Sequence, residues 1–278
     1  MENENDVSLQ NKTVAFIGAG NMGEALIRGL LAGRTVVPTQ IIATDVRAER
    51  RDFLMKTFGI QAIDDNLRAV KAADIVVLAV KPQQVGEVLA GFKSAMSNRK
   101  LVISIAAGVT TARIERELGE ATRVMRVMPN TPALVGAGAA GVAKGAHATD
   151  DDLVTAESIL GAVGICVRVE EKFIDAVTAL SGSGPAYVFY MTEAMIQAGV
   201  ASGLDKTLAK KLAIQTVYGA AKLLVESGEE PESLRRKVTS PGGTTEAALK
   251  VMAERKLAEI FAEAMKAAEK RSRELSGS

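Results

Sequence analysis

The sequence has very few of the residues that build metal centres and thiol-based sites. It contains one cysteine, Cys166, one histidine, His147, and no tryptophan among its 278 residues. A single cysteine excludes a disulfide within the chain, and its apolar setting in GICVRV favours a buried, reduced thiol over a nucleophile. A zinc site or a Cys–His catalytic pair therefore has almost nothing to be built from, and we expect no metal.

Long apolar runs and an excess of one charge are missing as well. No stretch approaches the roughly 18 uninterrupted apolar residues of a membrane-spanning helix, and the opening MENENDVSLQNK lacks the apolar segment of a signal peptide. The formal net charge of +1 offers no electrostatic footprint for nucleic acid or an anionic membrane. We therefore expect a cytoplasmic protein with no nucleic-acid and no membrane partner.

The two halves of the chain differ in their hydrophobic pattern. Short apolar runs rich in β-branched residues alternate with helical segments up to residue 169, which is typical of a parallel sheet with crossover helices. Beyond about residue 171, apolar residues recur at three- and four-residue spacing and no strand-like run follows. We predict an α/β domain with a mostly parallel sheet over residues 1–170 and an all-helical domain over 171–278. The expected strands are 13–17, 40–44, 74–80, 100–105, 122–127 and 164–169, with a further candidate within 135–144.

Helices are expected between these strands and throughout the second half. Asn66 and Thr110 are placed as N-caps of two of them. The segment 184–202 is apolar around most of its circumference, which a surface helix should not be; burial between subunits explains it, the alternative being a helix buried inside one monomer. We favour a homo-oligomer. The expected helices are 22–32, 47–58, 66–72, 84–96, 111–118, 150–160, 172–180, 184–202, 205–227, 231–237, 244–253 and 255–275.

A glycine-rich turn follows the first expected strand and opens the first helix. In a G-x-G-x-x-G pattern the first glycine permits a tight turn, the second permits close approach of a phosphate, and the third permits close strand–helix packing. The helix N-terminus would then direct free N–H groups and the positive end of its dipole at a dinucleotide pyrophosphate. A plain strand–helix turn is the alternative for so short a motif. The predicted pyrophosphate site consists of Gly18, Ala19, Gly20, Asn21, Met22 and Gly23.

The end of the second expected strand offers both kinds of ribose-reading residue. An acidic side chain there binds a ribose 2′-OH, and an arginine accommodates a 2′-phosphate. Asp45 fits the first role and Arg47, with Arg50 and Arg51 behind it, fits the second, although an arginine cluster on a helix is also typical of plain solvated charge. We predict that NADPH is preferred over NADH, with use of both plausible.

Two other strand ends are candidates for the rest of a dinucleotide. Ala79, Val80, Lys81 and Pro82 end the most apolar strand, and proline cannot continue it, so the chain turns where the middle of the cofactor would lie. Lys81 either contacts phosphate or ribose or reaches solvent. The small residues of 105–108 leave room for a nicotinamide ring, although a compact strand-to-helix turn explains them nearly as well.

The segment SPGGTT at 240–245 is the other conspicuous element. Its glycines, hydroxyls and free N–H groups at a helix start form a receptor for a small carboxylate, and an ordinary N-capped helix is the alternative. Reduction of a carbonyl needs a general acid, but neither lysine nor histidine occurs between Lys172 and Lys206. A substrate that carries its own proton, such as a protonated imine, needs only orientation, a carboxylate anchor and a hydrogen-bonding hydroxyl.

Taken together, these motifs resemble those of pyrroline-5-carboxylate reductases. The resemblance runs from about residue 12 to 272 and rests on GAGNMG, AVKP, the I-A-A-G turn, MPNTP, ALSGSGPAYVF and SPGGTT, the last two being highly specific. It implies an NAD(P)H-dependent enzyme that reduces the imino acid Δ1-pyrroline-5-carboxylate to L-proline, the last step of proline biosynthesis. It also implies an N-terminal Rossmann domain and a helical C-terminal dimerisation domain, in a dimer or a pentamer of dimers.

The resemblance further implies roles for individual residues. Thr245 would be the catalytic residue, hydrogen-bonding the ring nitrogen as an orienting group, while hydride passes to the imine carbon C5. The substrate loop would come from the partner subunit, so that the active site is shared between subunits. Asp45 stands where many relatives have a serine-rich turn, and its charge would repel a 2′-phosphate unless it points away. The implied substrate-binding residues are Ser240, Gly242, Gly243, Thr244 and Thr245; the implied cofactor-binding residues, beyond 18–23, are Thr44, Asp45, Arg47, Asn66, Ala79, Val80, Lys81, Pro82, Ile105, Ala106, Ala107 and Glu171.

Two other functions fit parts of the sequence. A β-hydroxyacid dehydrogenase shares the two-domain plan and the glycine turn, but it should carry a catalytic lysine on the long helix after the glycine pair, and residues 182–205 contain none. A non-catalytic NAD(P)-sensing protein would bind the dinucleotide without turnover and would leave SPGGTT unexplained. Subunit number and feedback regulation by proline do not follow from the sequence.

Overall fold

The computed structural model describes residues 9–119 and 121–277 and divides the chain into two compact units. The first comprises Met1–Ser183 together with Ala268–Ser278, and the second comprises Gly184–Ala267. The boundary predicted after residue 170 thus falls inside the first unit, because the segment 171–183 packs with the sheet domain. No helix among the described residues is long and apolar enough to span a bilayer.

The first unit is built on one eight-stranded sheet with the order β3-β2-β1-β4-β5-β6-β7-β8. All neighbouring strands run parallel except β6 and β7, which are antiparallel. This confirms the predicted mostly parallel sheet of Rossmann type. The strands are β1 (Val14–Ile17), β2 (Ile41–Thr44), β3 (Gln61–Ile63), β4 (Ile75–Leu78), β5 (Leu101–Ser104), β6 (Arg123–Met128), β7 (Gly138–Lys144) and β8 (Gly164–Arg168).

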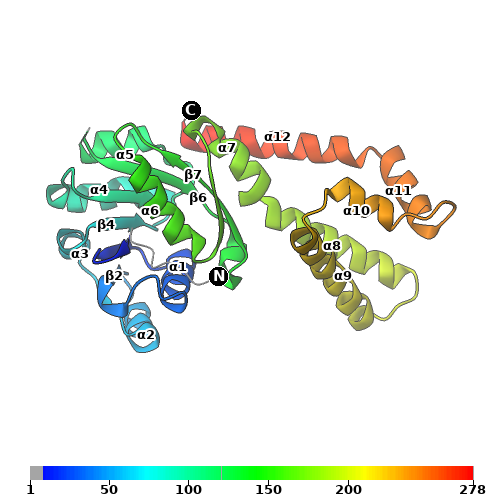
Figure 1. Cartoon of the computed structure of the whole chain (residues 1–278), viewed down its shortest axis with the longest axis horizontal. Coiled ribbons are helices and arrows are strands. Elements are labelled where there is room, and N and C mark those ends of the chain that lie inside the picture. Colours follow the sequence, from blue (N-terminus) through cyan, green and yellow to red (C-terminus); the bar gives the residue numbers. More distant parts are fainter. Residues whose placement is uncertain (1–8, 120, 278) are drawn as a thin grey trace. The chain divides into compact units, whose positions relative to one another are not determined.

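Helices cover both faces of this sheet (Figure 1). One face packs against α1, α2 and α6 through Leu26, Leu54 and Ile159, and the other packs against α3, α4 and α5. The central strands β1 and β4 are buried along their whole length, as their continuous apolar sequences predict. The helices are α1 (Asn21–Ala32), α2 (Ala48–Phe58), α3 (Asn66–Ala72), α4 (Val85–Phe92), α5 (Thr111–Leu118) and α6 (Asp150–Gly161), with short 3₁₀ turns η2 (Pro38–Gln40), η3 (Pro82–Gln84), η4 (Lys93–Ala95) and η5 (Thr131–Val135).

After β8 the chain is helical, as predicted, but not uniformly so. The segment expected as one helix over 172–180 consists of η6 (Glu171–Phe173), α7 (Ile174–Val177) and a π-helical turn, η7 (Thr178–Gly182). The π-turn closes with a bond of 2.8 Å from Ser183 N to Thr178 O. The remaining helices are α8 (Gly184–Ala201), α9 (Lys206–Ser227), α10 (Pro231–Lys237), α11 (Thr244–Glu254) and α12 (Leu257–Ser276).

The second unit buries little of its apolar surface. Gly199 in α8 faces Ala209 in α9, and within Gly184–Ala267 only Ala209 and Ala213 are buried. Large apolar side chains remain open, with Tyr190 75% and Val225 83% exposed. Monomeric proteins rarely leave so many large apolar side chains open, which favours a partner that covers this unit.

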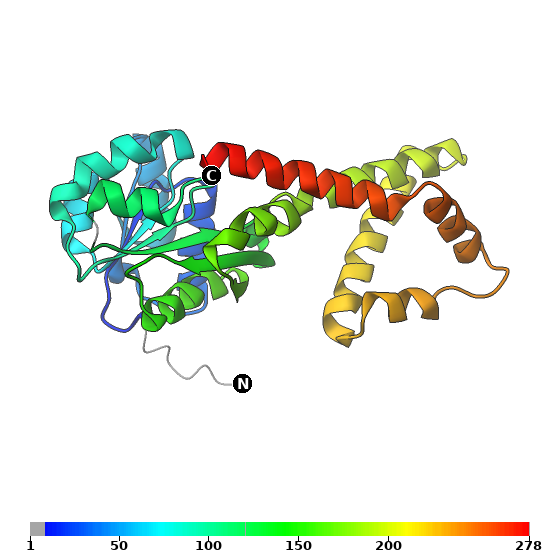
Figure 2. The same ribbon diagram turned by 90° about the horizontal axis from the view of Figure 1, so that it is seen from above.

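Figure 2 shows the last turns of α12 in red, ending beside the first unit, to which Ala268–Ser278 belong. The hydroxyl of Ser272 is buried there and donates to Asp175 Oδ1 at 2.6 Å. A Cβ placed on Gly108 would lie 3.3 Å from the backbone of Leu275. The C-terminal turns of the chain are thus part of the sheet domain.

Candidate functional site

The glycine turn follows β1 and its geometry explains each glycine. Gly18 has φ +85°, and a Cβ on it would lie 2.7 Å from Val80 Cγ1 and 3.0 Å from Ala79 O. A Cβ on Gly23 would lie 2.9 Å from Gly18 O, so this glycine permits the close packing of α1. Gly20 differs: a Cβ there would meet no atom within 4 Å. Open space beside the second glycine is what close approach of a phosphate requires.

Helix α1 begins directly beside this open space. Its N-cap is Gly20, and no side chain caps it. The first N–H groups of a helix have no intrahelical partner and carry the positive end of the helix dipole. Among the residues that the structure describes, α1 thus presents uncapped donors where a pyrophosphate would lie, and the residues present fit a dinucleotide.

Arg50 of α2 braces this turn from outside. Its Nε donates to Ala19 O at 2.6 Å, its Nη2 donates to Gly20 O at 3.3 Å, and Nη2 lies 2.7 Å from Glu24 Oε2. Burial alone would raise the pKa of Glu24, but hydrogen bonds from Arg50 and Arg28 hold it below the usual value. In this structure Arg50 is therefore a brace for the turn rather than a free phosphate ligand. Sequence reasoning assigned it to the arginine cluster and did not find this role.

The end of β2 carries the ribose-reading residues. Thr44 is buried, and its hydroxyl accepts from Gly18 N at 3.3 Å and donates to Phe16 O at 3.4 Å, joining β2 to the glycine turn. Asp45 Oδ1 accepts from Arg47 N and Nε, both at 3.0 Å, and Oδ2 accepts from Nη2 at 3.2 Å. Burial would raise the pKa of Asp45, but these bonds hold it below the usual value. Asp45 is thus an ionised carboxylate whose charge Arg47 balances.

Arg51 and Asn66 are placed differently from what the sequence suggested. Arg51 Nη1 donates to Asp45 O at 2.9 Å and its Nη2 lies 3.3 Å from Asp64 Oδ2, so it stabilises the turn after β2. The N-cap of α3 is Asp65, which accepts from Arg68 N at 2.9 Å, and Asn66 is the first helical residue. The predicted cap at Asn66 was therefore wrong by one residue, whereas the cap at Thr110 is confirmed.

The strand ends predicted to bind the rest of the cofactor are neighbours in the sheet. Ala79 N donates to Ile17 O at 2.8 Å and Ile105 N donates to Leu78 O at 3.1 Å, so the ladder continues past the ends of β1, β4 and β5. Ala107 is exposed and Ala106 is buried at this edge. The glycine turn, Ala79–Pro82 and Ile105–Ala107 therefore meet at the carboxyl edge of the sheet, where ligands of open α/β sheets bind.

Glu171 lies in a polar cluster behind the 105–110 loop. Its Oε1 accepts from Thr111 N at 2.8 Å, its Oε2 accepts from Thr111 Oγ1 at 2.5 Å, and Oε1 lies 3.2 Å from Arg126 Nη1. Arg126 Nη2 also lies 4.0 Å from Asp175 Oδ1. Both carboxylate oxygens of Glu171 thus have partners within the chain. A cofactor contact by Glu171 stays a prediction.

Asn130 was not assigned a role from the sequence, although MPNTP was noted. It is buried; its Nδ2 donates to Ser181 O at 3.0 Å and its Oδ1 accepts from Ala139 N at 2.9 Å. It therefore links the end of β6 and the start of β7 to the π-turn in the ALSGSG motif. A polar residue directly after a strand at the carboxyl edge was the available signal. π-turns occur frequently at functional sites.

The SPGGTT segment lies in the second unit and forms the turn into α11. Gly242 has φ +72°, Gly243 is the N-cap without a side-chain cap, and Gly243 N donates to Ser240 O at 3.0 Å. Glu246 Oε2 accepts from Gly242 N at 2.7 Å. The predicted N–H donor at Gly243 is thus engaged within the turn. Thr244 and Thr245 are the first helical residues, whose N–H groups have no intrahelical partner.

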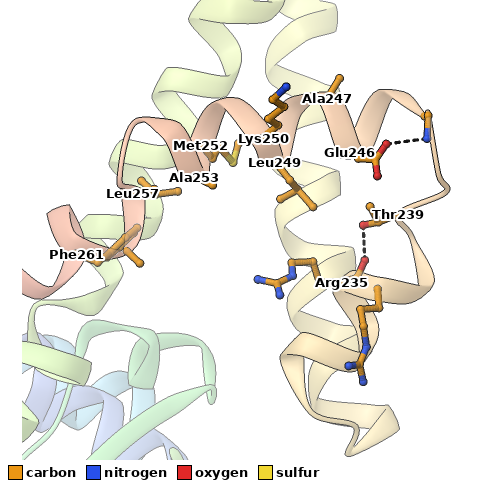
Figure 3. A pocket seen from close by; sticks show the side chains of 14 residues that line it. Arg235, Thr239, Glu246, Ala247, Leu249, Lys250, Met252, Ala253, Leu257 and Phe261 are labelled. Atoms are coloured by element: carbon orange, nitrogen blue, oxygen red, sulfur yellow. Dashed lines mark hydrogen bonds between the residues drawn. The ribbon is translucent and has the colours of Figure 1, made fainter.

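A groove of about 1130 Å³ lies beside this turn (Figure 3). Apolar side chains of α11 and α12 such as Met252 and Phe261 line it, and Arg235, Arg236 and Lys250 add positive charge. The dashed line from Glu246 in Figure 3 marks the hydrogen bond that its carboxylate accepts from the Gly242 amide. A cationic rim beside uncapped N–H groups suits a small carboxylate.

The single cysteine is not activated as a nucleophile. Cys166 lies half-buried on β8, and burial, reinforced by the charge of Glu157, raises its pKa to about 11. The thiol is therefore protonated near neutral pH, as the apolar context predicted. Among the described residues, no group of three or more His, Cys, Asp or Glu side chains gathers into a metal site.

Comparison with protein families assigns both parts of the chain. Residues 13–108 match the family described as NADP oxidoreductase, coenzyme F420-dependent. Residues 171–275 match the family described as pyrroline-5-carboxylate reductase dimerisation. The second match begins at residue 171, the first residue of the helical domain expected from the sequence.

Relatives that match this chain over nearly its whole length are named pyrroline-5-carboxylate reductases. A pyrroline-5-carboxylate reductase of Methanosarcina acetivorans is 45% identical over 267 residues, covering 96% of this chain and 99% of that protein. The solved structure of a pyrroline-5-carboxylate reductase from Coxiella burnetii has a TM-score of 0.91 at 43% identity, covering 95% and 98% of the two chains. That of Plasmodium falciparum, with NADP bound, has a TM-score of 0.83 at 30% identity over 96% and 98%. The chain therefore belongs to the pyrroline-5-carboxylate reductase family.

Proposed function

We propose that this chain reduces Δ1-pyrroline-5-carboxylate to L-proline, the last step of proline biosynthesis, as an NAD(P)H-dependent oxidoreductase. The observation that carries the proposal is the presence, in one chain that covers 99% of a pyrroline-5-carboxylate reductase, of both a dinucleotide-type glycine turn and the SPGGTT turn. NAD(P)H, when bound, supplies a hydride to the imine carbon C5. The imine nitrogen receives one proton, so that the C=N bond becomes the C–N bond of proline.

The dinucleotide would lie along the carboxyl edge of the sheet. Gly18–Gly23 and the N-terminus of α1 hold the pyrophosphate, because the turn leaves open space at Gly20 and presents uncapped donors. Thr44, Asp45, Arg47 and Asn66 take the adenosine side. Ala79–Pro82 and Ile105–Ala107 line the ribose and nicotinamide, with Glu171 behind them.

We further propose that NADPH is preferred and that NADH is also used. Of the three arginines at positions 47, 50 and 51, Arg47 is the most open to solvent. Its side chain is 57% exposed, whereas those of Arg50 and Arg51 are 16% and 19% exposed. Among the described residues the guanidinium of Arg47 hydrogen-bonds to Asp45, and it can turn from that carboxylate to a 2′-phosphate. The Plasmodium falciparum relative has NADP bound, which supports the same choice. The ionised Asp45 still offers an acceptor for a ribose 2′-OH, so NADH remains a substrate.

The substrate would bind at the turn before α11. Ser240, Gly242, Gly243 and the N–H groups of Thr244 and Thr245 surround its carboxylate, with the Gly243 amide turning from Ser240 O on binding. Thr245 orients the ring nitrogen by one hydrogen bond. The exposed apolar faces of α8 and α9 and the dimerisation match support a homo-oligomer. We propose a dimer, or a pentamer of dimers, in which the partner subunit supplies this turn.

One assay separates this function from its rivals. The absorbance of NADPH and NADH is followed with Δ1-pyrroline-5-carboxylate, and the oxidised cofactors are then offered with β-hydroxyacids. Imine-dependent oxidation of either reduced cofactor is expected. Turnover of hydroxyacids alone would indicate a β-hydroxyacid dehydrogenase, and cofactor binding without any turnover would indicate a sensing protein.

Thr245 tests the substrate half of the proposal. Thr245→Ala removes one hydrogen bond to the reacting ring, which should cost about 1–3 kcal/mol, or roughly 10- to 150-fold in kcat/KM for the imine. Thr245→Ser keeps the hydroxyl and should retain most of the activity. A Thr245→Ala enzyme with wild-type kcat/KM would show that this residue does not orient the substrate.

A further inference from the structure

The buried guanidinium of Arg126 lies in the middle of a chain of polar contacts that the reaction itself does not require. Only 5% of its side chain is exposed, and it faces Glu171 at 3.2 Å and Asp175 at 4.0 Å. A buried charge that loses its partners is strongly destabilising, so these carboxylates hold definite positions around it. Each of the two carboxylates contacts a different further segment of the chain.

Glu171 fixes the downstream end of the 105–110 loop. Its two oxygens accept from the backbone N–H and the hydroxyl of Thr111, the first residue of α5. The upstream end is already fixed, because Ile105 continues the ladder onto β4. The loop that carries Ala106 and Ala107 is thus held at both ends.

Asp175 connects the same cluster to the C-terminus. Ser272 of α12 donates to Asp175 Oδ1 at 2.6 Å, although its neighbours on the helix are exposed. One helical turn further on, the backbone of Leu275 lies 3.3 Å from the position of a Cβ on Gly108, where the loop has φ +70°. Residues three apart on a helix share a face, so Ser272 and Leu275 approach the loop together.

The C-terminal turn therefore reaches the 105–110 loop by two routes. One runs from Ser272 through Asp175, Arg126 and Glu171 to Thr111, and the other is the close approach of the Leu275 backbone to Gly108, where a Cβ would lie 3.3 Å from it. If the end of α12 served only to hold that helix in place, a single contact at any point of the sheet domain would be enough. Both routes end on the loop that follows β5 at the carboxyl edge, next to the end of β4 at Ala79, which in turn adjoins the end of β1.

We propose that residues 272–275 of α12 are positioning residues for the nicotinamide end of the dinucleotide, acting through the conformation of the 105–111 segment. The inference rests on the proposed function for the identity of the ligand. Loss of the Ser272 hydroxyl leaves Asp175 with one partner fewer and loosens the Arg126 cluster. Cofactor affinity then falls, because the loop must be ordered when the nicotinamide binds.

Hydrogen–deuterium exchange on the full-length, cofactor-free enzyme tests the proposal without relying on turnover. Ser272→Ala should speed amide exchange in 105–111 while exchange in β1 and α1 stays at the wild-type rate. A variant that ends after Glu274 removes the Leu275 contact but keeps Ser272, and it should speed exchange in the same segment. Arg271→Ala is the control, since this neighbouring side chain pairs, within the part of the chain that the structure describes, with Glu274 on its own helix.

Titration with NADPH, followed by the fluorescence of the nucleotide, measures the effect on binding. For Ser272→Ala we expect the dissociation constant to rise about three- to tenfold, the range that one hydrogen bond supplies. The truncated variant should also bind more weakly, while Arg271→Ala binds as the wild type. Ser272→Thr keeps the hydroxyl and should restore most of the affinity. Unchanged exchange in 105–111 and unchanged affinity in Ser272→Ala would overturn the proposal. Wild-type enzyme that binds NADPH but fails to reduce the imine would instead contradict the proposed function.

Discussion

Replacing Gly20 by alanine should separate cofactor binding from folding. A Cβ at this position meets no atom within 4 Å, and the backbone angles, φ −66° and ψ −166°, are accessible to any residue. The new methyl group would nevertheless occupy the space beside the N-terminus of α1. If the pyrophosphate lies there, the methyl pushes it away from the helix N–H groups.

The expected magnitudes follow from this geometry. Alanine is about 0.5–1 kcal/mol worse than glycine as an N-cap, but it lowers the entropy of the unfolded chain by an amount worth about 0.4–1 kcal/mol. These two terms nearly cancel, so the free energy of unfolding should change by less than about 0.5 kcal/mol. Loss of one N–H bond to a charged phosphate should cost about 1.5–3 kcal/mol, which raises the Kd of NADPH roughly 10- to 150-fold.

Gly18→Ala is the matched control, because it places the same methyl group two residues earlier. There φ is +85° and the Cβ would lie 2.7 Å from Val80 Cγ1, so we expect about 1–2 kcal/mol from the left-handed backbone and about 1–3 kcal/mol from overpacking. The Tm should fall by roughly 4–20 °C. Fluorescence titration and thermal unfolding of both variants are the measurements. A Gly20→Ala enzyme that binds NADPH as tightly as the wild type would refute the placement of the pyrophosphate.

Three further results are expected. Arg47→Ala should lower kcat/KM for NADPH more than for NADH, and equal losses would show that Arg47 does not read the 2′-phosphate. Arg50→Met should instead raise KM for both cofactors about tenfold, since Arg50 acts through the carbonyls of Ala19 and Gly20, and a selective loss of NADPH use would contradict that role. Burial raises the pKa of Cys166 from 9.0 to about 11, so its contribution to stability is complete below pH 9 and is lost as the pH rises towards 11. Alkylation at pH 7 should be slow and should leave activity intact; rapid labelling of the folded enzyme would contradict the protonated, half-buried thiol.

The strands and helices could be predicted from the sequence wherever apolar residues recur in a regular pattern over a whole element. The central strands are continuous apolar runs, and the second half repeats its apolar residues at helical spacing over a hundred residues. The strand β3 was missed because Gln61–Ile63 is only three residues long, too short to show a hydrophobic pattern. The cap of α3 was misplaced because Asp65 and Asn66 are both good capping residues, and only the backbone decides between them.

Site residues were predictable by their position at strand ends, whereas their contacts were not. The sequence places Arg47, Arg50 and Arg51 close together, and only Arg47 was assigned to the cofactor. In space Arg50 turns towards the glycine turn and Arg51 towards Asp64, which leaves Arg47 open. The bond between Ser272 and Asp175 joins residues 97 positions apart, and no local pattern reports such a pairing.

The apolar surface that the second unit exposes in a single chain makes the free energy of unfolding depend on protein concentration. Side chains such as Phe189, Tyr190 and Val225 gain their burial only when another chain arrives, so part of the folding free energy depends on protomer concentration. We expect the melting temperature to rise with protein concentration, and newly made chains to be at their most vulnerable to proteolysis while they are still dilute. The amount of enzyme in the cell is then itself a determinant of how well each copy is folded.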